Sequence, residues 1–550
     1  MPTPIFQLCD QHVQRSCELD PVSATMQGVA GDFPPATDYR PEGYAARAEL
    51  ARDTLRRLDD LTPTNDADQL AAAHLRERLT ASLAWYDTGE HLRLLRAPFG
   101  MLQSLRNSVD LMPRGDQDRW RAVVARLAAM PQMLAGWRES LAAGIDQGLV
   151  AARRQAVEAA GQAQRYADGA TFQAVADEYG EGPLQAELAD AVGKAHAAYA
   201  ETARWLRAEY APRAAERDAV GPERYAVAAR LSLGADIDPP EAYAWAWEEL
   251  RRLERELAVE ADRVVPGGDV SAAIAHLNET DYVTGVDAYR DWLQERHDEA
   301  IARLDGVHFD IPEPLRRVTV VALQNSAAGS AYYTPPSEDL RRPARTWWPV
   351  AGRERFGIWA ELTTVFHEGV PGHHLQLGQL RVVPPDRLSR FARLNGVSGY
   401  SEGWALYAER LADELGWHTT PGRRLGMLKA SALRAARVVI DIGLHLDLPL
   451  PPEEAERHGP RWTFEVATEV LRDRGRIAEH RLHPEVVRYC GWPAQASSYK
   501  LGERAWLAAR DEARQRLGDR FELKQWHTDA LSLGPVGLDT LTDQLRRVTV

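Results

Sequence analysis

The spacing of apolar residues most constrains the fold, because they recur every three to four positions through most of the 550-residue chain. This is the period of an amphipathic α-helix, and the alternation typical of half-buried strands is nearly absent. We therefore expect a mainly α protein. The helices that the pattern predicts are 44–61, 66–86, 102–112, 116–145, 150–167, 184–210, 225–233, 240–264, 270–278, 286–304, 423–446, 460–474, 500–517, 524–533 and 539–548.

One stretch departs from this period. Residues 317–323 and 345–350 are rich in β-branched and aromatic side chains, and the turn-forming segment from Ala328 to Pro336 lies between them. Such short runs, bounded by Gly and Pro, are typical of strands. The sequence therefore predicts one small β-sheet within 317–350, next to the helix that follows it.

Length and pattern together predict a large two-lobed helical protein with a deep central cleft. A chain of 550 residues can bury a large core, and no internal repeat or low-complexity linker separates two independent domains. We expect a single unit over 1–550, with a mostly helical N-terminal lobe at 1–215. The second lobe, 216–550, would carry the sheet at 317–350 and the helices at 355–415.

Composition excludes several classes of protein. The formal net charge of −14 argues against nucleic acid or an anionic membrane as a partner. Three cysteines, none in a C-x-x-C pair, are too few for a disulfide framework or a cysteine-ligated zinc. No signal-peptide pattern and no stretch of 18 apolar residues occurs, so we expect a cytoplasmic protein without a membrane span. The oligomeric state stays open, with a homodimer as one option.

Polar chemistry concentrates in the segment HEGVPGHH, which starts at His367 and follows an amphipathic run. A catalytic zinc needs about three nitrogen or oxygen ligands, an open position and a nearby general base. The usual H-E-x-x-H arrangement is absent, because Pro371 stands where its second histidine would be. The segment instead offers His367 as a ligand, Glu368 as a base, and two further histidines, His373 and His374.

Pro371 also affects the expected geometry. It cannot donate a hydrogen bond to the carbonyl of His367, and Gly372 adds backbone freedom, so we expect a kink or bulge between the histidines. In an unbroken helix His374 would lie almost above His367, whereas His373 would lie off that face. This reasoning does not hold across a break, so the spacing leaves both histidines open as the second ligand.

A carboxylate ligand is expected on a following helix. The segment from Gly399 to Glu409, GYSEGWALYAE, offers Ser401 as a helix cap and Glu402 in the first turn. Glu409 comes seven residues after Glu402 and shares its face, from which it could orient a ligand histidine by hydrogen bonding.

A second polar triplet, His297-Asp298-Glu299, is interpreted differently. Consecutive residues point to different sides of a helix, so we expect a charged surface face here and no metal cluster.

The alternative to a metal site at 367–374 is an inert segment. Lone histidines are mostly solvated on surfaces or hydrogen-bonded in cores. Three histidines and one glutamate within eight residues, directly after an apolar run, favour a metal site.

Four segments carry a resemblance to a known family: HEGVPGHHLQ, SEGWALYAE, Arg488-Tyr489 and PAQASSYKLG at 493–502. In this order they resemble the bacterial domain-of-unknown-function family 885, over nearly the whole chain. That family is similar to the gluzincin metallopeptidases of the thimet-oligopeptidase and angiotensin-converting-enzyme type. The resemblance implies that Gly372-His373 corresponds to the end of the gluzincin motif H-E-x-G-H, which favours His373 as the ligand and keeps His374 as the alternative. Val370-Pro371 expands that motif by two residues.

The resemblance implies a zinc-dependent hydrolase, most simply a peptidase that cleaves short peptides. One Zn²⁺ would be bound by His367, His373 and Glu402 and would activate a water, with Glu368 as the general base. In the peptidases that the chain resembles, a tyrosine or histidine downstream of the ligands stabilises the oxyanion. Tyr499 is therefore the candidate for that catalytic role.

The same resemblance suggests residues that bind substrate. Tyr489 is the second candidate for the oxyanion donor, and Lys500 and Arg488 could hold a substrate carboxylate or form surface ion pairs. In gluzincins the edge strand of a small sheet beside the zinc helix pairs with extended peptide, and Tyr333 lies in the corresponding segment. Its aromatic surroundings could equally be core and turn material.

Two other functions stay open. A related zinc scaffold could act as a hydrolase or lyase on a non-peptide small molecule, which the altered motif would permit. Alternatively, the chain could be a metal-free pseudoenzyme or a helical ligand-binding protein. The partner is in each case a short peptide or another small molecule.

Overall fold

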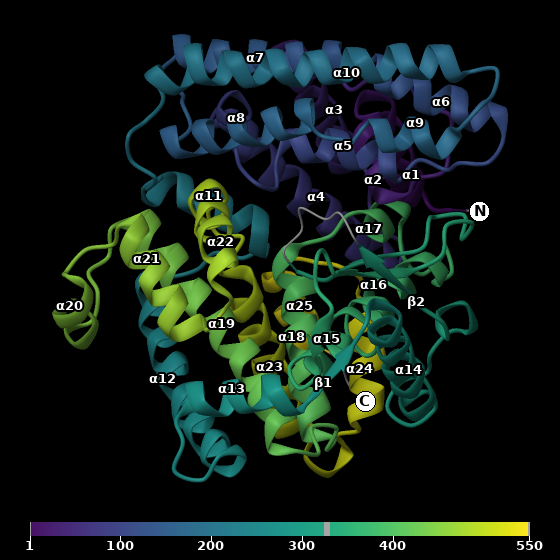
Figure 1. The fold of residues 1–550 in the computed structure, drawn as a ribbon. Helices are drawn as coiled ribbons and strands as arrows, with labels where there is room; N and C mark the ends of the chain where they lie inside the picture. Colours follow the sequence, from purple (N-terminus) through teal and green to yellow (C-terminus); the bar gives the residue numbers. More distant parts are fainter. Residues whose placement is uncertain (1, 324–329, 548–550) are drawn as a thin grey trace. The chain divides into compact units, whose positions relative to one another are not determined.

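The computed structural model describes residues 2–323 and 330–547. Over this part of the chain the protein is mainly α-helical, as the apolar period predicts (Figure 1). The chain divides into two compact units. The first runs to Val227 and includes the later segment His483–Pro493, and the second contains Ala228–Leu482 and Ala494 onward. The division therefore falls twelve residues beyond the expected position at 215, and the return of 483–493 to the first unit was not predicted. The expected cleft between lobes stays a prediction.

The first unit is built from helices, with short 3₁₀ or π-helical segments written η. Helix α10 packs along α6, α7 and α8, all in the blue and purple part of the ribbon (Figure 1). The elements are α1 (Pro4–Leu19), α2 (Pro21–Gln27), α3 (Pro41–Asp59), α4 (Asp66–Asp87), η1 (Glu90–Arg93), α5 (Met101–Asp110), α6 (Gln117–Ala128), α7 (Met130–Asp146), α8 (Arg153–Asp168), α9 (Gln173–Tyr179), α10 (Gln185–Trp205), η2 (Leu206–Tyr210) and η3 (Ala211–Arg213).

Two helices cross the boundary between the units: α11 (Pro222–Leu233) and α22 (Glu479–Gly491). The second unit adds α12 (Pro239–Val264), α13 (Val270–Thr280), α14 (Val286–Leu304), η4 (Glu313–Leu315), α15 (Glu361–Glu368), α16 (His373–Val382), α17 (Arg390–Leu394), α18 (Ser398–Glu414), α19 (Pro421–Leu446), α20 (Pro452–His458), α21 (Phe464–Val470), η5 (Leu471–Gly475), α23 (Ser498–Leu517), η6 (Gly518–Arg520), α24 (Leu523–Ser532) and α25 (Leu538–Arg547). Its strands are β1 (Tyr282–Thr284), β2 (Thr319–Leu323), β3 (Tyr332–Thr334), β4 (Arg345–Pro349) and β5 (Arg355–Gly357).

Helix starts follow local side-chain chemistry. The side chains of Asn65, Asp116 and Asp238 each accept a hydrogen bond from the backbone N–H three residues later, which satisfies an amide that the first helical turn leaves open. One predicted helix, 116–145, is in fact two: α6 ends before Ala129, and α7 begins with Pro131 in its first turn. Proline is favoured at that position because its missing N–H costs nothing there.

The described strands form two small sheets, where the sequence predicted one. Strands β2, β4 and β3 form a three-stranded sheet in which β2 pairs parallel and β3 antiparallel to the central β4. Strand β3 lies inside the segment expected to be a turn. The second sheet pairs β1 with β5 and was missed, because three residues are too few for a periodic signal. Ala328, Gly329 and Val548, which fall in the predicted turn segment and last helix, lie outside the described residues.

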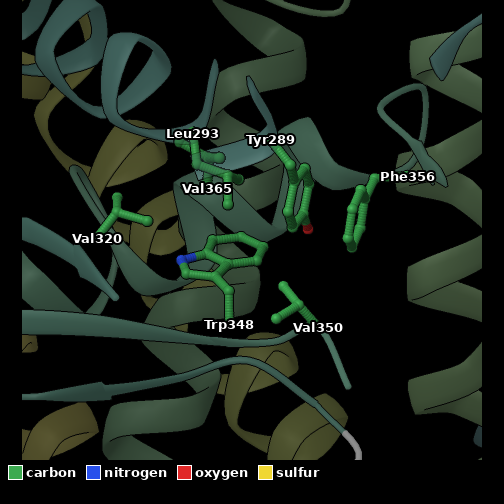
Figure 2. Close-up of a cluster of buried hydrophobic side chains, with 7 residues drawn as sticks. All are labelled: Tyr289, Leu293, Val320, Trp348, Val350, Phe356 and Val365. Atoms are coloured by element: carbon green, nitrogen blue, oxygen red, sulfur yellow. The ribbon is translucent and has the colours of Figure 1, made fainter. Parts of the chain in front are cut away.

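The three-stranded sheet is packed against the helix that precedes the histidine segment. Trp348 of β4 and Val320 of β2 meet Val365 of α15 and Leu293 of α14 in one buried cluster (Figure 2). Tyr289 completes it by stacking on Phe356 at a ring separation of 4.2 Å. Burial of such side chains contributes about 1.5–3 kcal/mol each. The sheet therefore fixes the position of α15 and of the histidine at its end.

Among the helices of residues 2–323 and 330–547, none has both the length and the apolar character that crossing a membrane requires.

Candidate metal centre

The histidine segment is interrupted between its two parts, which confirms the break that Pro371 predicts. Helix α15 ends at Glu368 and α16 begins at His373. The N–H of Gly369 still donates to Val365 at 2.8 Å, and the N–H of Gly372 reaches back to the carbonyl of Phe366 at 3.0 Å. The short connection therefore folds back on the end of α15 and brings the start of α16 beside it.

Close backbone packing requires glycine in this connection. A Cβ on Gly372 would lie 2.1 Å from the carbonyl oxygen of His367, and one on Gly369 would lie 2.4 Å from Nδ1 of His297. Neither side chain could be accommodated without moving α15. The indole N–H of Trp404 donates to the carbonyl of Pro371 at 2.8 Å and ties the connection to α18.

His367, His373 and Glu402 converge from three helices. Nε2 of His367 and Nε2 of His373 lie 3.4 and 3.5 Å from the same Oε2 of Glu402. The two imidazole rings are 4.8 Å apart and nearly perpendicular, at 83°. All three potential ligand atoms lie within 4.8 Å of one another. The side chains of His367 and His373 are 5 and 9% exposed, whereas the Glu402 side chain is 21% exposed, so the cluster can be reached from the Glu402 side.

His374 faces the other way, and this excludes it as a ligand in this arrangement. Its Nε2 donates to the carbonyl of Leu315 at 2.9 Å. That bond requires the proton on Nε2, so Nδ1 is an acceptor for the hydroxyl of Tyr333 at 3.0 Å. Burial lowers the pKa of His374 to about 4, so the ring is neutral at pH 7. The same contact links β3 to α16 through the Tyr333 hydroxyl, and the expected role of Tyr333 in substrate binding stays a prediction.

Glu402 is positioned by a helix that starts earlier than predicted. Helix α18 begins at Ser398, so Ser401 is not its cap and Glu402 lies in the second turn. The helix runs very close to α23: a Cβ on Gly403 would lie 2.4 Å from the carbonyl carbon of Gly502. Backbone contact between α18 and α23 therefore fixes the position of the helical turn that carries Glu402.

Glu409 lies behind His367, at the place that its seven-residue spacing from Glu402 predicts. Its Oε1 accepts a hydrogen bond from Nδ1 of His367 at 2.8 Å, and Thr363 donates to its other oxygen. Burial would raise the pKa of Glu409, but Arg434 and His367 outweigh it and lower the pKa to about 2. The carboxylate stays ionised and leaves Nε2 of His367 directed at Glu402.

The charges around the cluster are strongly coupled. Burial disfavours the protonated form of His367, yet Glu402 and Glu409 outweigh it and raise the pKa of His367 to about 9. Burial likewise disfavours the ionised form of Glu402, but His373 and His367 hold its pKa well below the usual range. Glu368 differs, because burial raises its pKa. A carboxyl group with a raised pKa next to an ionised one is a typical acid–base arrangement.

Carboxylate oxygens without hydrogen-bond partners indicate which kind of ligand the cluster can bind. Within the described residues, Oε2 of Glu402 and Oε2 of Glu368 are buried without a hydrogen-bond partner. A buried carboxylate oxygen of this kind is costly unless a cation or donor meets it. Two imidazole nitrogens and one carboxylate oxygen are the donor set of many catalytic zinc sites, and other divalent ions accept it too. The residues present therefore fit a divalent cation.

Two predicted residues of α23 have different surroundings. Tyr499 lies in its first turn, with the guanidinium of Arg437 5.0 Å from the ring centre. Lys500 is 1% exposed, and its ammonium group contacts Glu503, Glu249 at 3.1 Å and Ser431 at 2.8 Å. The alternative that Lys500 forms a surface ion pair is wrong, because the residue is buried and its charge is paired inside the unit. Its expected contact with a substrate carboxylate stays a prediction.

Arg488 and Tyr489 belong to the first unit. Both donate to the same oxygen of Glu485, at 2.9 and 2.6 Å. Both residues are buried, with 5 and 1% of their surface exposed. Their expected roles in substrate binding stay predictions.

The sequence interpretation missed two residues near the cluster. His297 was expected on the surface but is fully buried, with Nδ1 against Gly369, and burial lowers its pKa to about 3. A signal existed: His297 lies on the apolar stripe of α14 with Leu293 and Ile301. Asp298 is exposed, as predicted. Arg434 lies 3.4 Å from Glu409. Nothing in the sequence distinguishes it from the many other arginines of the chain.

Comparison with known proteins supports the fold. A crystal structure of a "putative lipoprotein" from Colwellia psychrerythraea matches with a TM-score of 0.82 and 21% identity, covering 99% of this chain and 98% of that one. A "putative lipoprotein of unknown function" from Shewanella oneidensis matches with a TM-score of 0.73 and 17% identity, covering 99 and 100%. No curated protein matches. The family model described as "bacterial protein of unknown function (DUF885)" matches residues 21–545, nearly the whole chain, which therefore belongs to that family.

Proposed function

We propose that the protein is a zinc-dependent hydrolase, most simply a peptidase acting on short peptides. The observation that carries the proposal is the convergence of His367, His373 and Glu402, with the buried carboxyl group of Glu368 next to them. The likeness of the motif to gluzincin peptidases supports the choice of a peptide bond. It does so although the segment is two residues longer than the gluzincin motif.

His367, His373 and Glu402 would hold the ion, and His374 would not, because both of its ring nitrogens are engaged elsewhere. When bound there, zinc would polarise the scissile carbonyl and lower the pKa of a coordinated water towards neutrality. Glu409 keeps the proton of His367 on Nδ1 and thereby leaves Nε2 available as a ligand.

Glu368 is suited to the role of general base. It is the residue directly after a ligand histidine, is 5% exposed, and has one oxygen without a hydrogen-bond partner among the described residues. Burial raises the pKa of its carboxyl group, which makes the carboxylate a stronger base. We propose that it takes the proton of the attacking water and later delivers it to the leaving amine.

Tyr499 remains the candidate for stabilising the oxyanion. The hydroxyls of Ser398 and Ser498 meet at 2.8 Å, so the first turn of α23 lies beside the first turn of α18. Glu402 follows Ser398 by one turn and Tyr499 follows Ser498 directly. A phenol at this place could donate to the developing charge on the carbonyl oxygen.

The test is Glu368→Gln, a change that keeps the shape and removes the base. Activity on a panel of short peptides with free and blocked termini should fall by roughly 10²–10⁴-fold, the usual contribution of a general base. Zinc content, measured by mass spectrometry, should stay at that of the unmodified protein. Glu361→Gln is a matched control: this residue begins the same helix, burial also raises its pKa, and its loss should leave turnover intact.

Three outcomes would contradict the proposal. Full activity of the Glu368→Gln protein with zinc bound would exclude this residue as the base. Absence of any bound divalent ion would favour a metal-free ligand-binding protein. Turnover of small esters or amides without any peptide cleavage would favour the alternative of a hydrolase or lyase for non-peptide substrates.

A further inference from the structure

The first unit contains a cavity of about 470 Å³. Its wall includes the aromatic side chains of Tyr39, Tyr44, Trp85 and Tyr86, with methionine among the other lining residues. This volume lies in the range of about 300–1,000 Å³ that small-molecule sites occupy, and an aromatic wall with few polar groups is typical of them. Every residue that lines the cavity belongs to the first unit.

One cation of the wall has no acidic partner. The guanidinium of Arg96 lies 3.8 Å from the ring centre of Trp492, and its Nε is buried without a hydrogen-bond partner. Among the described residues, no carboxylate pairs with Arg96. Burial lowers the pKa of Arg96 to about 10, so the group is still charged at pH 7. A buried, unpaired cation is unfavourable unless an anion meets it.

Two further donors, Arg47 and Tyr44, line the same cavity. Arg47 lies 4.5 Å from the ring centre of Tyr44 and uses one N–H for the backbone carbonyl of Asp38. The hydroxyl of Tyr44 is buried without a hydrogen-bond partner in the described chain. The one acidic side chain of the wall is Asp20, whose Oδ1 caps α2 and accepts a hydrogen bond from Thr37. The charged side chains of the wall are therefore two guanidinium groups and one carboxylate, which gives it a net positive charge.

We infer that this cavity binds a small aromatic carboxylate. Arg96, Arg47 and the hydroxyl of Tyr44 would receive the carboxylate group, since a guanidinium binds carboxylates through charge-assisted hydrogen bonds. The ring of the ligand would lie against the tyrosine and tryptophan side chains of the wall. This inference does not depend on the hydrolase proposal, because none of its residues belongs to the unit that carries the metal-type cluster.

The experiment compares two probes of the same shape on the full-length protein. Indole-3-acetate carries the carboxylate and indole-3-acetamide carries a neutral amide in its place. Isothermal titration should show the acid binding at least about tenfold more tightly, which corresponds to about 1.4 kcal/mol. In Arg96→Met, whose side chain can still pack on Trp492, this preference should disappear. Tyr44→Phe should weaken binding of the acid a few-fold, because it removes one hydrogen-bond donor and keeps the ring.

The control is Arg52→Met. Arg52 also lies over a ring of the wall, Tyr86 at 5.5 Å, but it is ion-paired with Asp87 and does not line the cavity. The Arg52→Met protein should bind both probes with the same affinity as the unmodified protein.

Three results would overturn the inference: equal affinity for acid and amide, no saturable binding of either probe, or unchanged affinity for the acid in Arg96→Met. If inorganic phosphate competed for the cavity as strongly as the aromatic acid, the part of the inference that specifies an aromatic ligand would be overturned. If Arg96→Met does not fold, Tyr44→Phe decides: a loss for the acid and not for the amide supports the inference, and no loss contradicts it.

Discussion

Two regions of the molecule leave opposite kinds of polar atoms unsatisfied. In the cluster around Glu402, the buried atoms without partners within the described chain include carboxylate oxygens, which are acceptors. At the cavity beside Arg96, they are a guanidinium nitrogen and a phenol hydroxyl, which donate. Because a buried polar group without a partner costs about 1–3 kcal/mol or more, each set indicates the sign of what completes it. A cation would satisfy the carboxylate oxygens of the first region, and an anion would satisfy the donors of the second.

The two regions also differ in what determines the pKa of their charged groups. Around Glu402, neighbouring carboxylates and imidazoles shift one another's pKa, so protonation and ion binding are linked. Around Arg96, aromatic side chains dominate and burial is the main influence on the pKa. In the first region the protonation states of several groups are linked, whereas in the second a single charged group is affected mainly by burial.

The largest effect is expected for Glu402→Gln, which removes charge from the acceptor cluster and keeps its shape. Loss of a residue that only supports a metal ligand costs about 10–100-fold in affinity, so loss of a ligand charge should cost more than about 100-fold. Competition with a chromophoric chelator measures the zinc affinity. Arg96→Met serves as the matched control and should bind zinc normally. Equal affinity in the Glu402→Gln protein would remove this carboxylate from the metal site.

A smaller loss is expected for Glu409→Gln. The amide can still accept from Nδ1 of His367 but no longer supplies a charge, so zinc affinity should fall by about 10–100-fold. The same chelator titration applies. Glu414→Gln, on the same helix but paired with Arg510 away from the cluster, should leave the affinity unchanged. Identical losses in both variants would point to a general weakening of α18.

The smallest effect concerns stability and has the opposite sign. Arg96→Met removes a partly buried cation that has no acidic partner, so the free energy of unfolding should rise by about 1 kcal/mol. The pKa of Arg96 is lower in the folded state than in the unfolded chain. The destabilisation is therefore fully present below pH 10 and decreases only above it. Urea unfolding should give the same gain at pH 7 and pH 9. A loss of stability would mean that Arg96 is satisfied as it stands.

Much of the site could be predicted from local sequence. The histidines, Glu402, Glu409 and the break at Pro371 depend on residue type and short spacing, which a sequence shows directly. The choice between His373 and His374 could not be made from spacing, because the fold-back between α15 and α16 sets their directions. The resemblance favoured the histidine that the structure brings to the cluster.

Other features depend on contacts between distant segments. Lys500 pairs with Glu249, far away in the sequence, so no local pattern distinguished a buried lysine from a substrate-binding one. The cavity combines residues of α2 to α5, and its unpaired arginine is visible only once the neighbours of each group are known. The helical character of the fold was evident from the apolar period. The second sheet was too short to leave such a signal.

The contact between Gly403 and Gly502 has a consequence for how this protein can change. Glu402 is held at its depth by main-chain atoms of two helices that touch without side chains between them. Because a methyl group at either position would force those helices apart, the distance from the carboxylate to the imidazoles cannot be tuned by gradual substitution there. Variation would be confined to the residues that border the cluster, while the spacing of the three converging groups stays fixed.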